Sequence, residues 1–268
     1  MLRVSASNFF EEDILHLAVR IVVIPPSHTR QSIGTGFLYE AHLNDGTNRS
    51  ITFVVSNKHV FENPLGTLQI HINRKNIEGG PDYGNIYTFE ARNFSSLYFP
   101  HPDEEVDLAC VNVSDITHRN VFIRNLDEKF ISKFDASKVL VSSDVIFVGY
   151  PYDRYDVRNN LPIVRKGSIA SLPSLNFNGK SQILIDAQVF EGSSGSPVFT
   201  VIDDKYYLLG VVSQTMIRHS MLQTLQANYS NMGVKQILGL GIVIKQINVR
   251  ELIDFAVSEF LKKEKNHP

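Results

Sequence analysis

Short apolar stretches and clusters of turn-forming residues alternate along the whole chain. One stretch places Ile51, Phe53 and Val55 at every second position, which is typical of a strand with one buried face. Turn-rich pieces such as residues 44–46 and 78–82 separate such stretches. The pattern predicts strands near residues 19–24, 34–40, 51–56, 67–73, 86–91 and 106–113, and again near 145–148, 163–170, 182–187, 196–202, 206–213 and 239–244. Two sets of six strands predict an all-β protein.

Three segments depart from the strand pattern. Residues 8–18 have the spacing of a short amphipathic helix, and the polar stretch 115–138, with its spaced apolar residues, predicts a helical or irregular crossover. The tail from residue 246 places Leu252 and Phe255 on the apolar stripe of a helix that Asn248 is suited to cap. We expect this helix to dock on the second set of strands.

These patterns divide the chain into consecutive parts: a helical lead-in (1–18), a first set of strands (19–114), a crossover (115–138), a second set of strands (139–245) with an insertion (216–237), and a C-terminal helix (246–268). The chain has 268 residues, of which 43% are hydrophobic. This length can hold one large domain or two small ones, and this apolar content suffices for a sizeable core.

Composition narrows the classes of partner. The net charge of -2 gives no bulk attraction to nucleic acid or to an anionic membrane, so we expect neither as a partner. Cys110 is the single cysteine, and it lies in a predicted strand without a glycine turn around it. We therefore expect it to be a small buried hydrophobe. Acidic residues 11–13 interrupt any N-terminal signal or spanning helix, so we expect a cytoplasmic protein.

The stretch 190–199, FEGSSGSPVF, carries the strongest candidate chemistry. Gly192 and Gly195 allow positive φ or a close approach of the backbone, so that consecutive N–H groups can converge on one point beside Ser194. Converging amide dipoles stabilise an oxyanion. Ser194 is thus a candidate nucleophile, although a Gly/Ser-rich run is also typical of a surface turn.

A base and an orienting carboxylate lie upstream. His59 follows a predicted buried strand, where the scaffold holds it yet leaves it near solvent, as suits a general base. Asp107 lies within the apolar run 106–111, and a buried carboxylate is costly unless a partner such as the His59 imidazole pairs with it. The order His-Asp-Ser differs from the Ser-Asp-His order of α/β-hydrolases, and Ser196 replaces the second glycine of their nucleophile motif.

With these residues in place, the chain resembles the trypsin-like (chymotrypsin-fold) serine proteases, particularly the bacterial branch of the high-temperature-requirement proteases. The segments that carry the resemblance are GTGFL (34–38), VVSNKHV (54–60), VDLACV (106–111), VGYP (148–151), KGSIAS (166–171), IDAQVFEGSSGSPVF (185–199) and GLGIVI (239–244). Seven segments in the right order form a specific signal. The resemblance implies two six-stranded antiparallel β-barrels, chymotrypsin-like, with the site between them.

The resemblance also implies roles for named residues. Ser194 would attack the scissile carbonyl, with His59 as general base and Asp107 as its orienter. The N–H groups of Gly192 and Ser194 would hold the oxyanion. The substrate-binding positions would be Gln188 at the base of an uncharged pocket, and Ser213, Gln214 and Thr215 on a strand that pairs with an extended peptide.

Two features bear on regulation. Ser193 stands where zymogen-derived members carry an Asp that receives a freed N-terminus, so activation by that ion pair is not expected. The insertion 216–237 directly follows the substrate strand and is either a lid or a surface decoration. We expect no PDZ domain after the C-terminal helix.

The function that these residues predict is that of a serine endopeptidase, which hydrolyses peptide bonds of a protein or peptide substrate through an acyl-enzyme intermediate. No cofactor is expected, and no His or Cys spacing suggests a metal. The alternative is a catalytically inactive binding or scaffold protein that keeps the fold. An esterase would use the same three residues.

Overall fold

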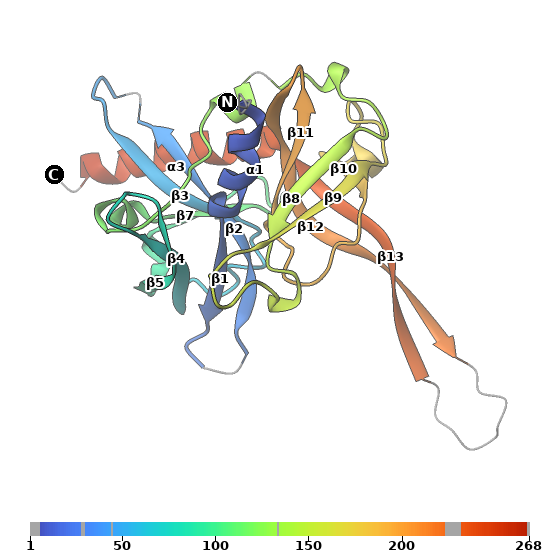
Figure 1. The fold of residues 1–268 in the computed structure, drawn as a ribbon, viewed down its shortest axis with the longest axis horizontal. Helices are drawn as coiled ribbons and strands as arrows, with labels where there is room; N and C mark the ends of the chain where they lie inside the picture. The colour runs from blue at the N-terminus through green and yellow to red at the C-terminus, as the bar shows by residue number, and fades with distance from the viewer. Residues whose placement is uncertain (1–5, 28–29, 44, 133, 223–231, 267–268) are drawn as a thin grey trace.

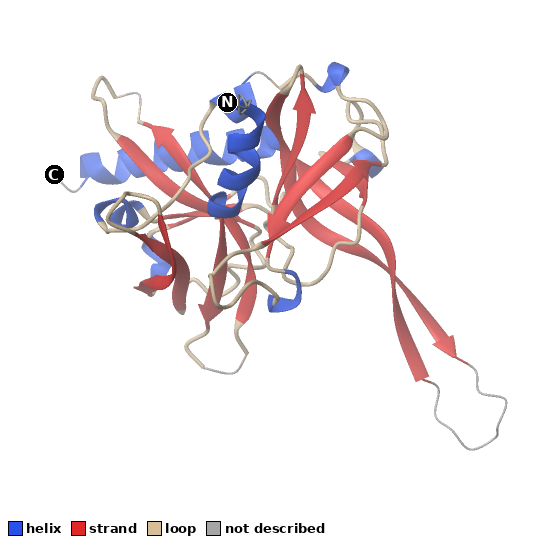
Figure 2. Ribbon diagram, viewed as in Figure 1, coloured by secondary structure: helices blue, strands red, loops and turns tan. Residues whose placement is uncertain are grey.

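The computed structural model describes residues 6–27, 30–43, 45–132, 134–222 and 232–266. Its strands form two lobes (Figures 1 and 2). The first lobe contains β1 (Ala18–Ile24), β2 (Ser32–His42), β3 (Ser50–Ser56), β4 (Thr67–Lys75), β5 (Pro81–Arg92), β6 (Tyr98–Pro100) and β7 (Ala109–Asn112). The second contains β8 (Asp144–Gly149), β9 (Ile163–Ile169), β10 (Gln182–Asp186), β11 (Pro197–Ile202), β12 (Lys205–Leu222) and β13 (Met232–Lys245).

The two lobes differ in closure. The second lobe is a closed barrel in the order β10-β13-β12-β11-β8-β9, and the first is a seven-stranded sheet in the order β5-β4-β1-β2-β3-β7-β6. The predicted all-β class with a C-terminal helix is confirmed, while the first lobe has one strand more than expected. The additional strand is β6, whose three residues are too few to show a period-two pattern. It lies at the sheet edge, where the missing N–H of Pro100 is tolerated.

Helical segments lie before, between and after the lobes. The helix expected at residues 8–18 is α1 (Ala6–Leu17), and it buries Ile14 and Leu17. In the predicted crossover lie the short helices η2 (Ser114–His118), α2 (Lys129–Ser132) and η3 (Ala136–Lys138). The remaining short helices are η1 (Phe94–Ser96), η4 (Pro151–Asp153) and η5 (Phe177–Gly179). The last element is α3 (Gln246–Asn266).

The C-terminal helix packs differently from the prediction. It contacts β6 and β7 of the first lobe as well as β12 and β13 of the second, so it spans both lobes rather than the second alone (Figure 1). One buried cluster joins Leu252 of α3 to Phe53 of the first lobe and Val211 of the second. The helix begins at Gln246, and Asn248 is not its cap: the Asn248 amide donates to the Ser181 carbonyl and hydroxyl instead.

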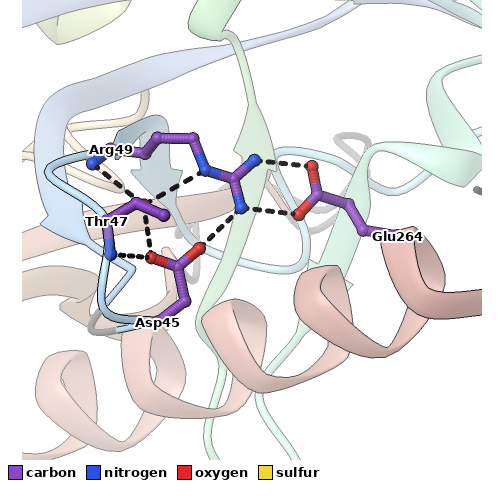
Figure 3. A network of polar contacts seen from close by, with 4 residues as sticks. All are labelled: Asp45, Thr47, Arg49 and Glu264. Carbon is purple, nitrogen blue, oxygen red and sulfur yellow. Dashed lines mark hydrogen bonds and ion pairs between the residues drawn. The ribbon is translucent and has the colours of Figure 1, made fainter.

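Polar contacts fasten the outer end of α3 to the first lobe. Arg49, just before β3, binds Glu264 at 3.0 and 3.2 Å and Asp45 at 2.6 Å, while Thr47 also bonds to Asp45 (Figure 3). These groups are exposed, where ion pairs contribute about 0–1 kcal/mol each. The burial of Leu252 and its neighbours therefore dominates the attachment of the helix.

The predicted insertion is an extension of the β12–β13 hairpin. Residues 217–222 pair with residues 232–237 in an antiparallel ladder, and the two arms project away from both lobes (Figure 1). Residues 223–231 of the insertion lie outside the described part of the chain. Both strands are longer than the sequence pattern indicated.

Candidate active site

A tight turn carries Ser194 at the junction of the two lobes. Gly192 and Gly195 have φ values of 85° and 87°, in the left-handed region that favours glycine. A Cβ on Gly195 would overlap the Thr35 carbonyl oxygen and the Ser56 hydroxyl. The turn is therefore pressed against β2 and β3 of the first lobe, and the two glycines are required by its geometry.

The N–H groups around Ser194 divide into two kinds. Those of Ser193, Gly195 and Ser196 donate to backbone carbonyls at 2.9–3.0 Å. Those of Gly192 and Ser194 have no acceptor among the hydrogen bonds of the described residues. An unpaired N–H at a half-buried turn is available to a ligand. The Gly192 and Ser194 N–H groups are the two that the family resemblance implies for an oxyanion site, and that role stays a prediction.

His59 and Asp107 meet at the rim of the first lobe. His59 follows β3 in a turn, and its Nδ1 lies 2.7 Å from Asp107 Oδ2, while its backbone N–H donates to Asp107 Oδ1 at 3.2 Å. The prediction placed Asp107 inside a strand, but it precedes β7. Its side chain is 28% exposed. The Asn57 amide fixes this segment by donating to the Asp107 carbonyl at 2.7 Å. Both residues are thus held by backbone as well as side-chain contacts.

Ser213 connects Asp107 with Ser194. It lies at a bulge in β12, where the pairing with β13 shifts between Val212 and Gln214. Its hydroxyl donates to Asp107 Oδ2 at 3.3 Å, and its carbonyl accepts from the Ser194 hydroxyl at 3.1 Å. The structure thus brings Asp107, His59 and Ser194 to one place through Ser213. Among the hydrogen bonds of the described residues, none joins His59 to Ser194.

Thr35 is a residue of this site that the sequence reasoning missed. It is fully buried in β2, where its N–H donates to the Ser194 carbonyl at 3.0 Å. Its hydroxyl donates to the Gly192 carbonyl at 2.8 Å and accepts from the Tyr150 N–H at 3.0 Å. The available signal was the pair of glycines around it in GTGFL, which leaves room for close packing. Thr35 thus fastens the Ser194 turn to the first lobe.

The predicted substrate positions lie on two neighbouring segments. Gln188 is exposed and precedes the Ser194 turn, while Gln214 is exposed and Thr215 half-buried on β12. The Thr215 hydroxyl donates to the carbonyl of buried Val189. This bond ties the β12 segment to the segment that carries Gln188. The pocket role of Gln188 stays a prediction.

Cys110 is fully buried in β7, as predicted, and burial raises the pKa of its thiol well above the usual value. Within the described ranges, no group of three or more His, Cys, Asp or Glu side chains is placed to hold a metal ion. No helix in the same ranges has the length and apolarity to cross a membrane.

Two lobes with a serine, a histidine and an aspartate at their junction define the chymotrypsin-like class of fold. The model of the trypsin-like peptidase domain family matches residues 34–211, and the chain belongs to this family. That match covers β2 to the middle of β12, and so includes all three residues.

Solved structures agree with the fold. The chain is similar to an HtrA-type protease, AlgW with tripeptide, with a TM-score of 0.56 and 12% identity over 95% of this chain and 64% of that one. It is also similar to the Rv3671c protease from M. tuberculosis in its active form, with a TM-score of 0.51 and 15% identity over 92% and 83% of the two chains. The chain thus spans 64% of the length of the HtrA-type structure. A comparison with curated protein sequences gives no match.

Proposed function

We propose that the chain is a serine endopeptidase that cleaves peptide bonds through a covalent acyl-enzyme. The observation that carries the proposal is the joint presence of a hydrogen-bonded His59–Asp107 pair and of a Ser194 turn with two N–H groups that have no acceptor among the described residues. A base with its orienter, a nucleophile and oxyanion donors are the parts that acyl transfer requires.

The first half of the reaction forms the acyl-enzyme. Ser194 Oγ attacks the scissile carbonyl carbon while His59 Nε2 takes the hydroxyl proton. The carbonyl π electrons move to oxygen, which becomes an oxyanion bound by the N–H groups of Gly192 and Ser194. The intermediate then collapses: the C–N bond breaks, and His59 returns the proton to the leaving amine.

The second half releases the acid product. A water molecule gives a proton to His59 and attacks the acyl carbon. The ester C–O bond then breaks, and His59 passes the proton to Ser194 Oγ. Throughout, Asp107 keeps the proton of the neutral imidazole on Nδ1, so that Nε2 is the acceptor. The Ser194 hydroxyl now donates to the Ser213 carbonyl, so the attack needs a rotation of the Ser194 side chain toward His59.

The substrate class follows from the strand beside Ser194. Gln214 and Thr215 lie at the irregular part of β12, where the pairing with β13 shifts on either side of them. An extended peptide would add there as a strand, with backbone hydrogen bonds giving affinity. Because Gln188 carries no charge, we propose a preference for small or medium apolar side chains rather than Arg or Lys.

A catalytically inactive scaffold protein is the second candidate. The hydrogen bond from Ser194 to Ser213 in place of one to His59 favours it. Labelling with a fluorophosphonate probe separates the two candidates, because the probe needs an activated serine. We expect labelling of the wild type and none of Ser194→Ala or His59→Ala. An unlabelled wild type, beside a labelled control protease, would support the scaffold.

Digestion of a peptide library, read by mass spectrometry, tests the peptidase itself. We expect cleavage by the wild type and a loss of turnover on the order of a millionfold in Ser194→Ala. Hydrolysis of ester substrates without any peptide cleavage would point to an esterase instead. Cleavage mainly after Arg or Lys would contradict the proposed pocket.

A further inference from the structure

The orientation of one peptide unit decides whether the oxyanion site exists. The Glu191 carbonyl accepts a hydrogen bond from the Tyr152 N–H of η4 at 2.5 Å. All described peptide bonds are trans, and in a trans unit the C=O and the next N–H point in opposite directions. Holding the Glu191 oxygen toward η4 therefore turns the Gly192 N–H away from η4, and this N–H has no acceptor in the described part of the chain. Reversal of this peptide would remove one of the two oxyanion donors.

The segment that holds the Glu191 oxygen is in an unfavourable conformation. Tyr152 and Asp153 have φ values of 50° and 57°, two consecutive non-glycine residues in the left-handed region. Such a backbone persists only where surrounding contacts determine it. The Tyr152 ring packs on Phe190 with centroids 5.1 Å apart, but this contact lies within the same pair of loops. A contact from outside the η4 segment and the Ser194 turn is therefore needed to hold η4 in place.

That external contact comes from the first lobe. Arg20 of β1 binds Asp153 through two parallel hydrogen bonds, Nε to Oδ1 at 2.5 Å and Nη2 to Oδ2 at 2.9 Å. The Arg20 side chain is only 13% exposed, and its guanidinium lies 5.6 Å from the centre of the Tyr155 ring. The Asp153 side chain is 39% exposed, so the pair is partly buried. A two-pronged ion pair fixes geometry better than a single contact. Burial lowers the pKa of Arg20, but the bond and charge of Asp153 outweigh this and the pKa is raised.

Strand register places this contact beside the one made by Thr35. Arg20 and Thr35 are directly paired across β1 and β2, so both side chains stand on the same face of the sheet. Thr35 binds the Gly192 carbonyl, and Arg20 binds the residue next to Tyr152. The first lobe therefore contacts the Gly192 carbonyl directly and also holds η4, which binds the Glu191 carbonyl. By contrast the Ser193 hydroxyl, buried in the turn, has no hydrogen-bond partner among the described residues.

We propose that Arg20 and Asp153 form a positioning pair, which holds η4 so that the Glu191–Gly192 peptide presents its N–H to the substrate oxyanion. The pair acts through the backbone bond from Tyr152 to Glu191 and touches neither substrate nor Ser194. It makes the oxyanion site depend on the docking of the first lobe onto the loops of the second. This inference rests on the proposed peptidase function.

Steady-state kinetics on peptide substrates test the pair with Arg20→Ala, Arg20→Lys and Asp153→Asn. Loss of one oxyanion donor lowers kcat by about 10²–10³-fold, so partial loss of its orientation should lower kcat by roughly 10–100-fold. KM should change by less than about threefold, because the donor acts mainly in the transition state. Arg20→Lys keeps the charge without the fork and should give an intermediate kcat. A peptidyl boronic acid, which forms a tetrahedral adduct on Ser194, should bind more weakly in proportion to kcat.

Arg49→Ala is the matched control. Arg49 also forms a two-pronged ion pair between distant elements, with Glu264 (Figure 3). It lies just before β3, at the opposite end of that strand from Ser56. The kcat of Arg49→Ala should stay within about twofold of the wild type. Unchanged kcat in Asp153→Asn and Arg20→Lys, with boronate affinity unchanged, would overturn the positioning role alone. Absence of turnover and of fluorophosphonate labelling in the wild type would overturn the proposed function, and this inference with it.

Discussion

At the residue scale, the Asp107 carboxylate is the most constrained group of the site. It accepts from the His59 backbone, faces His59 Nδ1 and accepts from the Ser213 hydroxyl. Three contacts to one carboxylate fix its plane, and the contact with Nδ1 places the ring proton there and leaves Nε2 as the acceptor. A single residue thus determines both the orientation and the tautomer of the proposed base.

Replacing Asp107 by Asn should lower kcat on the order of 10⁴-fold while the fold persists. The Asn amide can donate where the carboxylate accepted, which favours the His59 tautomer that cannot take a proton at Nε2. Peptide hydrolysis and far-UV circular dichroism measure the two effects. Asp103→Asn is the control, because Asp103 lies in the same loop and its carboxylate accepts only from the Glu105 N–H in the described contacts. A kcat within tenfold of the wild type in Asp107→Asn would exclude this role.

The Thr35 hydroxyl offers a test of the contact between the lobes. Thr35→Val keeps the shape but leaves the Gly192 carbonyl and the Tyr150 N–H without their partner. Each unpaired group costs about 1–3 kcal/mol when it is buried, so with a buried Tyr150 N–H and a half-buried Gly192 carbonyl the free energy of unfolding should fall by about 2–4 kcal/mol. Urea denaturation measures it. Thr200→Val, which removes one partly buried bond to the Asp144 carbonyl, should cost about 1 kcal/mol, and an equal loss in both variants would contradict the bridging role.

At the element scale, α3 stabilises the packing of both lobes rather than of the second alone. Its buried residues Val249, Leu252 and Ala256 share one cluster with residues of β2, β3, β11 and β12. An element that buries its apolar stripe between two lobes stabilises their relative position as well as its own fold. This matters for function because the proposed catalytic residues come from separate lobes.

Leu252→Ala should therefore destabilise the protein by about 2–5 kcal/mol, as expected for truncation of a fully buried leucine. Thermal and urea denaturation measure the change. Ile247→Ala, on an exposed face of the same helix, should change stability by less than about 0.5 kcal/mol. If the two variants were equally stable, the helix would not contribute to the core that joins the lobes.

Element types could be predicted from the sequence because most strands here carry a local signal, as in the alternation of Ile51, Phe53 and Val55. The ends of strands and the strands at sheet edges carry less of this local signal. The start of β7 two residues after Asp107 depends on hydrogen bonds from Asn57 and His59, which come from another segment. The extended arms of β12 and β13 depend on pairing with each other. Local periodicity cannot report such contacts.

At the scale of the whole molecule, the proposed site could be predicted only in part, because only some of its residues carry a signal in the local sequence. Ser194, His59 and Asp107 stand out because each is chemically unusual in its local context. Thr35 and Asp153 do not, since their roles arise from the packing of one lobe on the other. Arg20 left a usable signal: a lone charge inside the apolar run 18–24 needs a partner, but the sequence cannot say which.

Buried and half-buried histidines in different parts of the fold make the stability of the whole molecule depend on pH. Burial lowers the pKa of His16, His71 and His101 from the usual 6.5. His101, 4% exposed, also accepts a hydrogen bond from the Asp103 N–H at Nδ1, which a proton on that atom would break. Because the unfolded chain binds these protons more readily, the stabilisation is complete above about pH 6.5 and is lost as the pH falls below it.

We expect the melting temperature to fall between pH 7 and pH 5. Over this window the carboxylates with depressed pKa values, such as Asp135 and Asp156, contribute little, because they take up protons below their usual 3.8. His101→Asn keeps an acceptor for the Asp103 N–H but cannot be protonated, so its melting temperature should depend less on pH. Differential scanning calorimetry of both proteins at matched ionic strength measures the slopes. Equal slopes would mean that His101 takes no part in the acid destabilisation of the folded protein.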